Sequence, residues 1–155
     1  MKPNAETRIA QLTRNDEKWT SALMAEGWTA VPSVLLVYQL ELGLDPLDLN
    51  ILLQIAKHWW EAGNLPHPSK QQIAKAMNVA PRTVQRHLTN MEKVGLIERI
   101  DRFDQRGGRR TNGYRFAGLI AKAAEYAKEM HEERLERIAA KAKRQKRTPG
   151  LRVVK

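Results

Sequence analysis

Two short helical segments joined by a three-residue turn restrict the possible folds of this chain more than any other feature. Ser69 and Gln72 have the spacing of a capping box, which predicts a helix from residue 70 to about residue 77. Residues 78–80 leave room only for a tight turn. Pro81 suits the first position of a second helix, because the nitrogen at that position needs no hydrogen bond within the helix.

The second helix has two faces of different chemistry. Its inward stripe repeats at intervals of four and three residues and consists of Val84, Leu88 and Met91. The side chains outside this stripe are Arg82, Thr83, Gln85, Arg86 and Thr89. In the DNA major groove, which admits a helix, arginine pairs with guanine, glutamine pairs with adenine and the threonine methyl contacts thymine. The two segments therefore predict a helix-turn-helix whose second helix reads DNA bases.

The periodicity changes after Gly95. Residues 96–100 and 114–116 are predicted to be the two strands of a hairpin, joined by a polar, glycine-rich loop over residues 104–113. The basic residues of the loop are Arg106, Arg109 and Arg110. Beside a helix-turn-helix, these arginines are expected to contact phosphates or a narrow minor groove. A solvated, disordered loop is the alternative.

Residues 69–97 resemble the core of bacterial winged helix-turn-helix proteins. They share a polar cap, an Ile-Ala pair, a small turn, a Thr-Val pair and a final Gly-Leu-Ile before the wing. The resemblance implies a mostly α-helical fold with a small β-hairpin, and double-stranded DNA as the partner. Ala80 departs from the pattern, because the family usually has a Ser or Thr there that caps the helix and touches a phosphate. Residues 31–46 are similar to the segment before the domain in phage and plasmid replication-type members.

Positive charge is concentrated in the second half of the chain. Residues 1–68 carry five Lys or Arg against eight Asp or Glu, whereas residues 69–155 carry 22 against nine. A basic C-terminal segment, residues 134–155, explains part of this excess. Residues 69–115 still hold eleven basic residues against four acidic ones. Such an imbalance indicates a polyanionic partner, with Lys70 and the C-terminal segment expected to hold DNA phosphates.

The remaining segments are predicted to be helical. A capping signal at Asp45 and Pro46 starts a helix that follows an apolar period to Ala62, and a shorter helix precedes it over residues 33–42. The expected organisation is an N-terminal helical extension (1–30), a winged helix-turn-helix domain (31–117), a long C-terminal helix (118–146) and a basic disordered tail (147–155).

The terminal helices carry more apolar surface than one small winged domain needs. One apolar face runs from Ile9 to Leu23 and includes Leu12 and Trp19. The other runs from Leu119 to Met130. A homodimer through the terminal helices would bury both faces. In the competing arrangement, the helices fold back on a monomeric core. The heptad is irregular over residues 131–134, which argues against a long regular coiled coil. In a further alternative, the C-terminal helix extends as a basic arm along DNA phosphates.

Several functional classes lack support in the sequence. The chain has no cysteine, and the spacing of His58, His67, His87 and His131 is not that of metal ligands, so no metal site is predicted. No phosphate-binding loop, nucleophile elbow, paired catalytic carboxylates or dinucleotide motif is present, and we expect no enzymatic activity, cofactor or small-molecule ligand. The longest apolar run is too short for a membrane span. The chain is expected to be a cytoplasmic, nucleoid-associated bacterial protein.

The sequence thus predicts sequence-specific binding of double-stranded DNA, most simply for transcriptional regulation. Two alternatives stay open. One is a replication-initiation or plasmid-maintenance factor that uses the same domain at an origin. The other is an RNA-binding or assembly adaptor in which the basic segments contact RNA.

Overall fold

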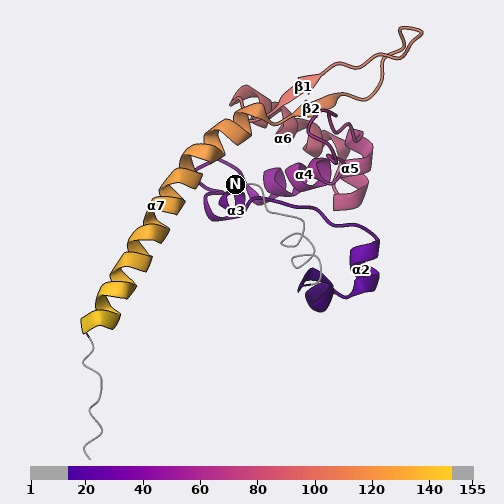
Figure 1. Cartoon of the computed structure of the whole chain (residues 1–155). Coiled ribbons are helices and arrows are strands. Elements are labelled where there is room, and N and C mark those ends of the chain that lie inside the picture. The colour runs from indigo at the N-terminus through magenta and orange to yellow at the C-terminus, as the bar shows by residue number, and fades with distance from the viewer. Residues whose placement is uncertain (1–13, 148–155) are drawn as a thin grey trace, which may run out of the picture. The chain divides into compact units, whose positions relative to one another are not determined.

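A computed structural model of the chain describes residues 14–147, with side chains described as far as residue 144 (Figure 1). The chain divides into two compact units, residues 1–30 and residues 31–155. Ile9, Leu12 and most of the predicted basic tail lie outside the described residues. Within them, no helix is both long enough and apolar enough to cross a bilayer.

The first unit contains two short helical segments where the sequence predicted one. Residues 14–19 are helical, and α2 (Ser21–Ala25) follows after a break at Thr20. Thr20 has a φ of +69°, which a continuous helix does not allow, and its hydroxyl caps α2 by accepting a hydrogen bond from the Leu23 nitrogen.

The second unit starts with α3 (Val34–Val37), which is shorter than the predicted helix because the chain enters turns after Val37. The predicted capping signal of the next helix is confirmed: α4 (Pro46–Ala56) follows a capping box formed by Asp45 and Asp48. The predicted end of this helix at Ala62 is wrong.

The chain leaves the helix after Ala56 through tight turns, in which the amide of Trp59 donates to the Ala56 carbonyl. These turns bring the Trp59 ring to 5.5 Å from the ring of Phe116. Trp59 is therefore partly buried in the core although it is not part of the helix. The apolar period places Trp59 in the core whether the helix continues or ends in turns. The period alone therefore predicted too long a helix.

The helix-turn-helix forms as predicted. α5 (Lys70–Met77) has the Ser69–Gln72 capping box, and Asn78 adopts a left-handed conformation in the turn. α6 (Pro81–Lys93) starts at Pro81 and buries Val84, Leu88 and Met91. Ala80 provides no side-chain cap, in keeping with its departure from the family pattern.

The wing, defined here as residues 98–115, is a two-stranded antiparallel hairpin. β1 (Glu98–Ile100) pairs with β2 (Gly113–Arg115), so that Arg99 lies opposite Tyr114. Leu96 and Ile97, predicted as the start of the first strand, instead lie buried in the core just before it. On the other side of β2, the Tyr114 amide donates to the Pro66 carbonyl and thereby attaches the loop before α5 to the wing.

The long C-terminal helix α7 (Ala117–Arg147) packs on its own domain along its first half only. Leu119 and Ala123 are buried, and the ring of Tyr126 stacks on Tyr38 with the centroids 4.9 Å apart. All described side chains from residue 131 onward are exposed. The domain itself therefore covers part of the Leu119–Met130 segment, whereas Ile120, Ala124 and Ala127 stay exposed. The homodimer through the terminal helices stays a prediction.

Candidate nucleic-acid interface

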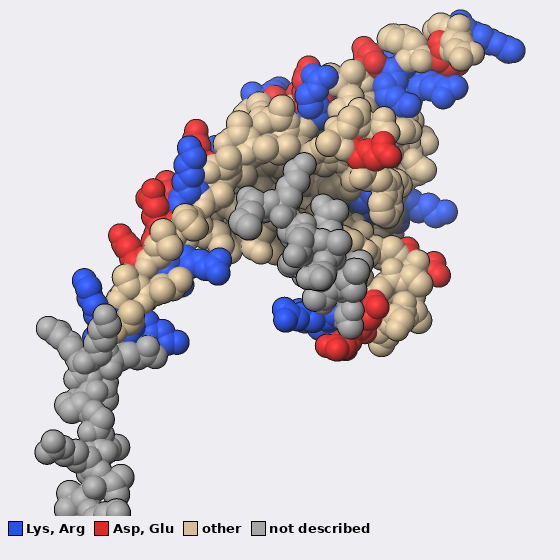
Figure 2. All heavy atoms as spheres, viewed as in Figure 1, with Lys and Arg blue, Asp and Glu red and all other residues tan. Residues whose placement is uncertain are grey.

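An open groove of about 830 Å³ lies between the helix-turn-helix and the base of the wing. Five of the predicted DNA-binding residues line it: Lys70, Arg82, Gln85, Arg109 and Arg110. Arg99 of β1 adds a further cation, and the lining includes no acidic residue. Figure 2 shows Lys and Arg side chains gathered along the hairpin and at its base. The groove therefore presents concentrated positive charge next to hydrogen-bonding side chains.

A chain of hydrogen bonds runs across this surface from α5 to the wing. The Lys70 ammonium donates to the Gln85 side-chain oxygen, and the Gln85 amide nitrogen donates to the Thr89 hydroxyl at 3.0 Å. The Arg99 guanidinium then donates to the same hydroxyl at 3.5 Å. Gln85 is thus held in one orientation in the free protein, which lowers the entropy cost of using it to bind a partner.

Glu92 and Arg99 connect α6 to β1. The Glu92 carboxylate accepts hydrogen bonds from the Arg99 backbone nitrogen at 3.2 Å and from Nε at 2.8 Å, and a terminal guanidinium nitrogen also donates to it. The side-chain hydrogen bond from Arg99 lowers the pKa of Glu92 below its ordinary value. This ion pair fixes the position of the wing relative to the exposed face of α6. Sequence reasoning missed Arg99, because an alternating strand pattern does not indicate which helix an arginine will face.

The tip of the wing is a closed turn and not the disordered loop of the alternative interpretation. One carboxylate oxygen of Asp104 accepts hydrogen bonds from the amides of Arg106 at 2.9 Å and Gly108 at 2.8 Å. Gly107 has a φ of +78°, a conformation that favours glycine. Arg106 lies within this turn, whereas Arg109 forms an exposed ion pair with Asp101 at 3.0 Å. Such an exposed pair contributes little energy, so a phosphate can displace the carboxylate easily.

Four of the predicted DNA-binding residues lie outside the groove lining. Arg86 is exposed on α6, and Thr83 is half-buried on the same helix. Thr89 belongs to the hydrogen-bond chain, and Arg106 lies at the wing tip. The structure thus brings part of the predicted set together and leaves the others on the adjoining helix face and on the tip.

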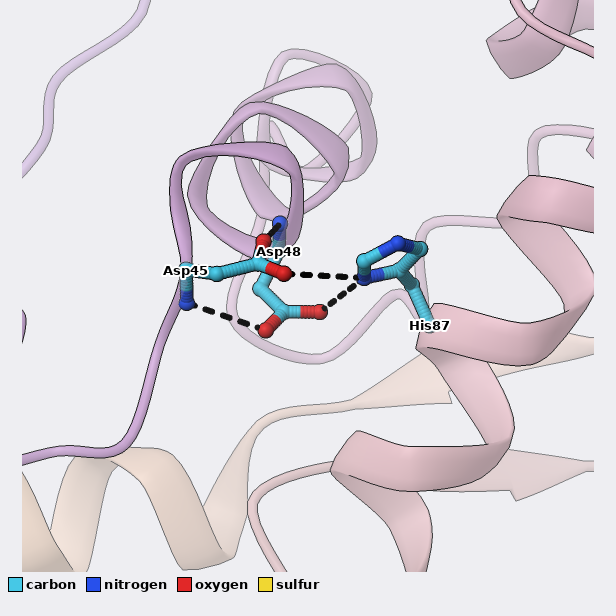
Figure 3. Close-up of side chains that lie close together, drawn as sticks. All are labelled: Asp45, Asp48 and His87. Atoms are coloured by element: carbon cyan, nitrogen blue, oxygen red, sulfur yellow. Dashed lines mark hydrogen bonds and ion pairs between the residues drawn. The ribbon is translucent and has the colours of Figure 1, made fainter.

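Sequence reasoning also missed a cluster behind α6, in which Asp48 and His87 are buried and Asp45 is exposed. His87 points from α6 toward the start of α4, where its Nδ1 lies 2.7 Å from a carboxylate oxygen of Asp48 and 3.6 Å from one of Asp45 (Figure 3). The other oxygen of each carboxylate accepts a backbone amide in the capping box of α4. Ligand atoms of these three residues lie within 4.8 Å of one another. Because their hydrogen bonds already satisfy both carboxylates, we assign the cluster the role of holding α6 against α4.

Comparisons with known proteins agree with this architecture. Residues 42–97 match a family model described as a helix-turn-helix domain. No curated protein matches the chain in sequence.

Solved structures with a similar fold include the N-terminal domain of the DnaD protein from Geobacillus kaustophilus HTA426. This domain is 23% identical to the chain and has a TM-score of 0.53, and the alignment covers 77% of this chain and 96% of that one. A possible transcriptional regulator from Methanosarcina mazei Go1 is 17% identical, with a TM-score of 0.43 and coverages of 70% and 87%. The YusO protein from Bacillus subtilis is 19% identical, with a TM-score of 0.39 and coverages of 94% and 100%.

The family match covers the two helices of the motif, and the fold adds a hairpin directly after them. Residues 42–97 therefore contain a helix-turn-helix domain, and the hairpin directly after it completes a winged-helix fold.

Proposed function

We propose that this chain binds specific sites in double-stranded DNA and regulates transcription through that binding, without catalysing a reaction. The observation that carries this proposal is the groove in which cations of α5, α6 and the wing converge, with no acidic residue in its lining. A surface of this kind attracts a polyanion, and the exposed face of α6 supplies the side chains that distinguish bases.

In the proposed complex, the first turns of α6 enter the major groove. Arg82, Thr83, Gln85 and Arg86 face the base edges, with Gln85 already oriented by its hydrogen bonds. The wing arginines lie along the adjacent backbone or minor groove, and Lys70 contacts a phosphate. The Glu92–Arg99 ion pair keeps the wing at the spacing that both contacts require.

Base reading is tested by substitution on α6. A site is first selected from a random pool of DNA duplexes, and binding is then measured on that site and on unrelated DNA. Gln85→Ala and Arg86→Ala should each cost about 1–3 kcal/mol on the selected site and little on unrelated DNA. Lys93→Ala is the matched control, because Lys93 is an exposed cation in the last turn of the same helix, away from the groove. Equal losses on both DNAs would show that the side chains contact only the backbone.

The wing is tested separately through salt dependence. Replacing Arg106, Arg109 and Arg110 with Ala should weaken binding and reduce the slope of log K against log salt by about 0.9 for each lost phosphate contact. The melting temperature should change little, because all three side chains are exposed. An unchanged salt slope would exclude the wing as a DNA-binding element.

Regulation is tested by mapping the sites that the protein occupies on the DNA of its own organism. Sites in promoters support the regulator, whereas a cluster at one origin would favour the replication-type role. Competition between duplex DNA and structured RNA of equal length tests the RNA-binding alternative. Stronger binding of the RNA would overturn the proposed function.

A further inference from the structure

One face of α7 carries an exposed apolar stripe with a strict repeat. We define the α7 stripe as Ile120, Ala124, Ala127, His131, Leu135, Ile138 and Ala142. Ile120, Leu135 and Ile138 are 53%, 52% and 57% exposed. The stripe advances by four, three and four residues, so each position recurs after 11 residues. It is distinct from the face of Leu119 and Ala123, which the domain covers.

The 11-residue repeat keeps the stripe on one side of a nearly straight helix. Eleven residues in three turns correspond to about 3.67 residues per turn, close to the 3.6 of an undistorted α-helix. From Ile120 to Ala142 the stripe therefore extends roughly 33 Å along one side, at about 1.5 Å per residue. A heptad does not fit this spacing, which explains the irregularity over residues 131–134. The repeat also allows two such helices to stay in contact along this length with little supercoiling.

Charges of opposite sign flank the stripe. Glu125, Glu132 and Glu136 each directly follow a stripe residue, whereas Arg134, Arg137 and Lys141 each directly precede one. Successive helical residues are about 100° apart, so the two sets lie on opposite sides of the stripe. Lys128 and Lys143 are the two cations on the acidic side.

These flanks distinguish between the two ways of pairing equal helices. In a parallel pair, the acidic flank of one helix meets the basic flank of the other. In an antiparallel pair centred on His131, like flanks meet, which brings Glu125 of one helix against Glu136 of the other and Glu132 against its own copy. Opposite charges across such a seam set the orientation of paired helices, so charge favours the parallel arrangement.

We propose that the α7 stripe binds the same stripe of a second copy of this chain, with the two helices parallel and in register. The interface buries Leu135 and Ile138 against their counterparts and places His131, the polar residue of the seam, opposite its own copy. The proposal concerns self-association alone and does not rest on DNA binding, so the two can fail independently.

The first experiment measures mass by sedimentation at micromolar concentration. The chain should sediment at about twice its monomer mass of 17.7 kDa. Changing both Leu135 and Ile138 to Glu should raise the dimer dissociation constant by about 100-fold or more, because four apolar side chains are lost from the interface of each dimer. Ala140→Glu is the matched control, because it adds one charge to the same exposed segment outside the stripe. A monomeric wild type, or a dimer that the double substitution leaves intact, would overturn the proposal.

The second experiment determines orientation by disulfide formation. The natural chain has no cysteine, so introduced thiols react without background. In a parallel, in-register pair, Ile138→Cys lies next to its own copy and should form a covalent dimer on mild oxidation. In an antiparallel pair centred on His131, position 138 instead faces position 124. Crosslinking of Ala124→Cys to Ile138→Cys in a mixture, without crosslinking of Ile138→Cys alone, would reject the parallel arrangement.

Discussion

Residue 118 has no room for a side chain. A Cβ built on Gly118 would lie 1.7 Å from the backbone carbonyl oxygen of Gly95, and the next amide, that of Leu119, donates to the Leu96 carbonyl at 2.9 Å. The start of α7 is thus in direct backbone contact with the turn that ends α6. A single methyl group would force these two elements apart.

We expect Gly118→Ala to lower the free energy of unfolding by about 1–3 kcal/mol or more, because no flexible side chain can yield to the new methyl. Gly63→Ala is the control, since nothing lies within 4 Å of the added Cβ there. That change should be neutral or slightly stabilising. Urea unfolding of both variants measures the difference, and equal stability of the two would show that α7 does not start against this turn.

His87 is a second residue whose role depends on distant contacts. We expect His87→Ala to lower the free energy of unfolding by about 2–4 kcal/mol, because it opens a cavity and removes the hydrogen-bond partner of the nearly buried Asp48. The exposed His58 provides the comparison, and His58→Ala should change the urea midpoint only slightly. A loss in His87→Ala no larger than in this control would contradict the assigned role.

At the scale of elements, the Glu92–Arg99 pair makes the attachment of the wing to α6 pH-dependent. The pKa of Glu92 is lowered in the folded protein from its ordinary value of 4.5, chiefly by the side-chain hydrogen bond from Arg99. A carboxylate whose pKa is lowered by folding stabilises the folded protein at pH values above its ordinary pKa. This stabilisation is lost as the pH falls through the lowered pKa.

As the pH falls from about 5 to below 4.5, the wild type should therefore lose more stability than Glu92→Gln, whose side chain does not titrate. The Glu92 side chain is 34% exposed, so water limits the difference to roughly 1 kcal/mol or less. Thermal unfolding of both proteins over this pH range measures the effect. Parallel pH profiles would show that the pair contributes nothing to stability.

At the scale of the whole molecule, self-association couples stability to concentration. If α7 pairs as proposed, the melting temperature of the full chain should rise with protein concentration, because mass action favours the folded dimer. A chain truncated after Met130 should melt at the same temperature at all concentrations. The truncated chain keeps Leu119 and Ala123 in the core. Of the residues that it loses, those whose side chains the structure describes, 131–144, are all exposed. A concentration-independent melting temperature in the full chain would contradict the pairing.

The starts of α4, α5 and α6 could be predicted from sequence, because the signals there are local. Capping boxes at Asp45 and Ser69 and prolines at first helical positions act between residues at most three apart. The inward stripe of α6 also follows from helical period alone. Together with the basic loop, these signals were sufficient to predict the winged helix-turn-helix and five of the residues that line the groove.

Tertiary structure alone decided which distant groups meet. His87 and Asp48 are 39 residues apart in the chain, and the Lys70–Gln85 hydrogen bond and the place of Arg99 in the groove likewise depend on how whole elements pack. Packing also decided which apolar face of α7 is covered. Leu119 and Ile120 are neighbours of similar hydropathy, yet the core buries one and leaves the other exposed. Local signals determine where a helix starts, whereas the side that it buries depends on the shape of the surface against which it packs.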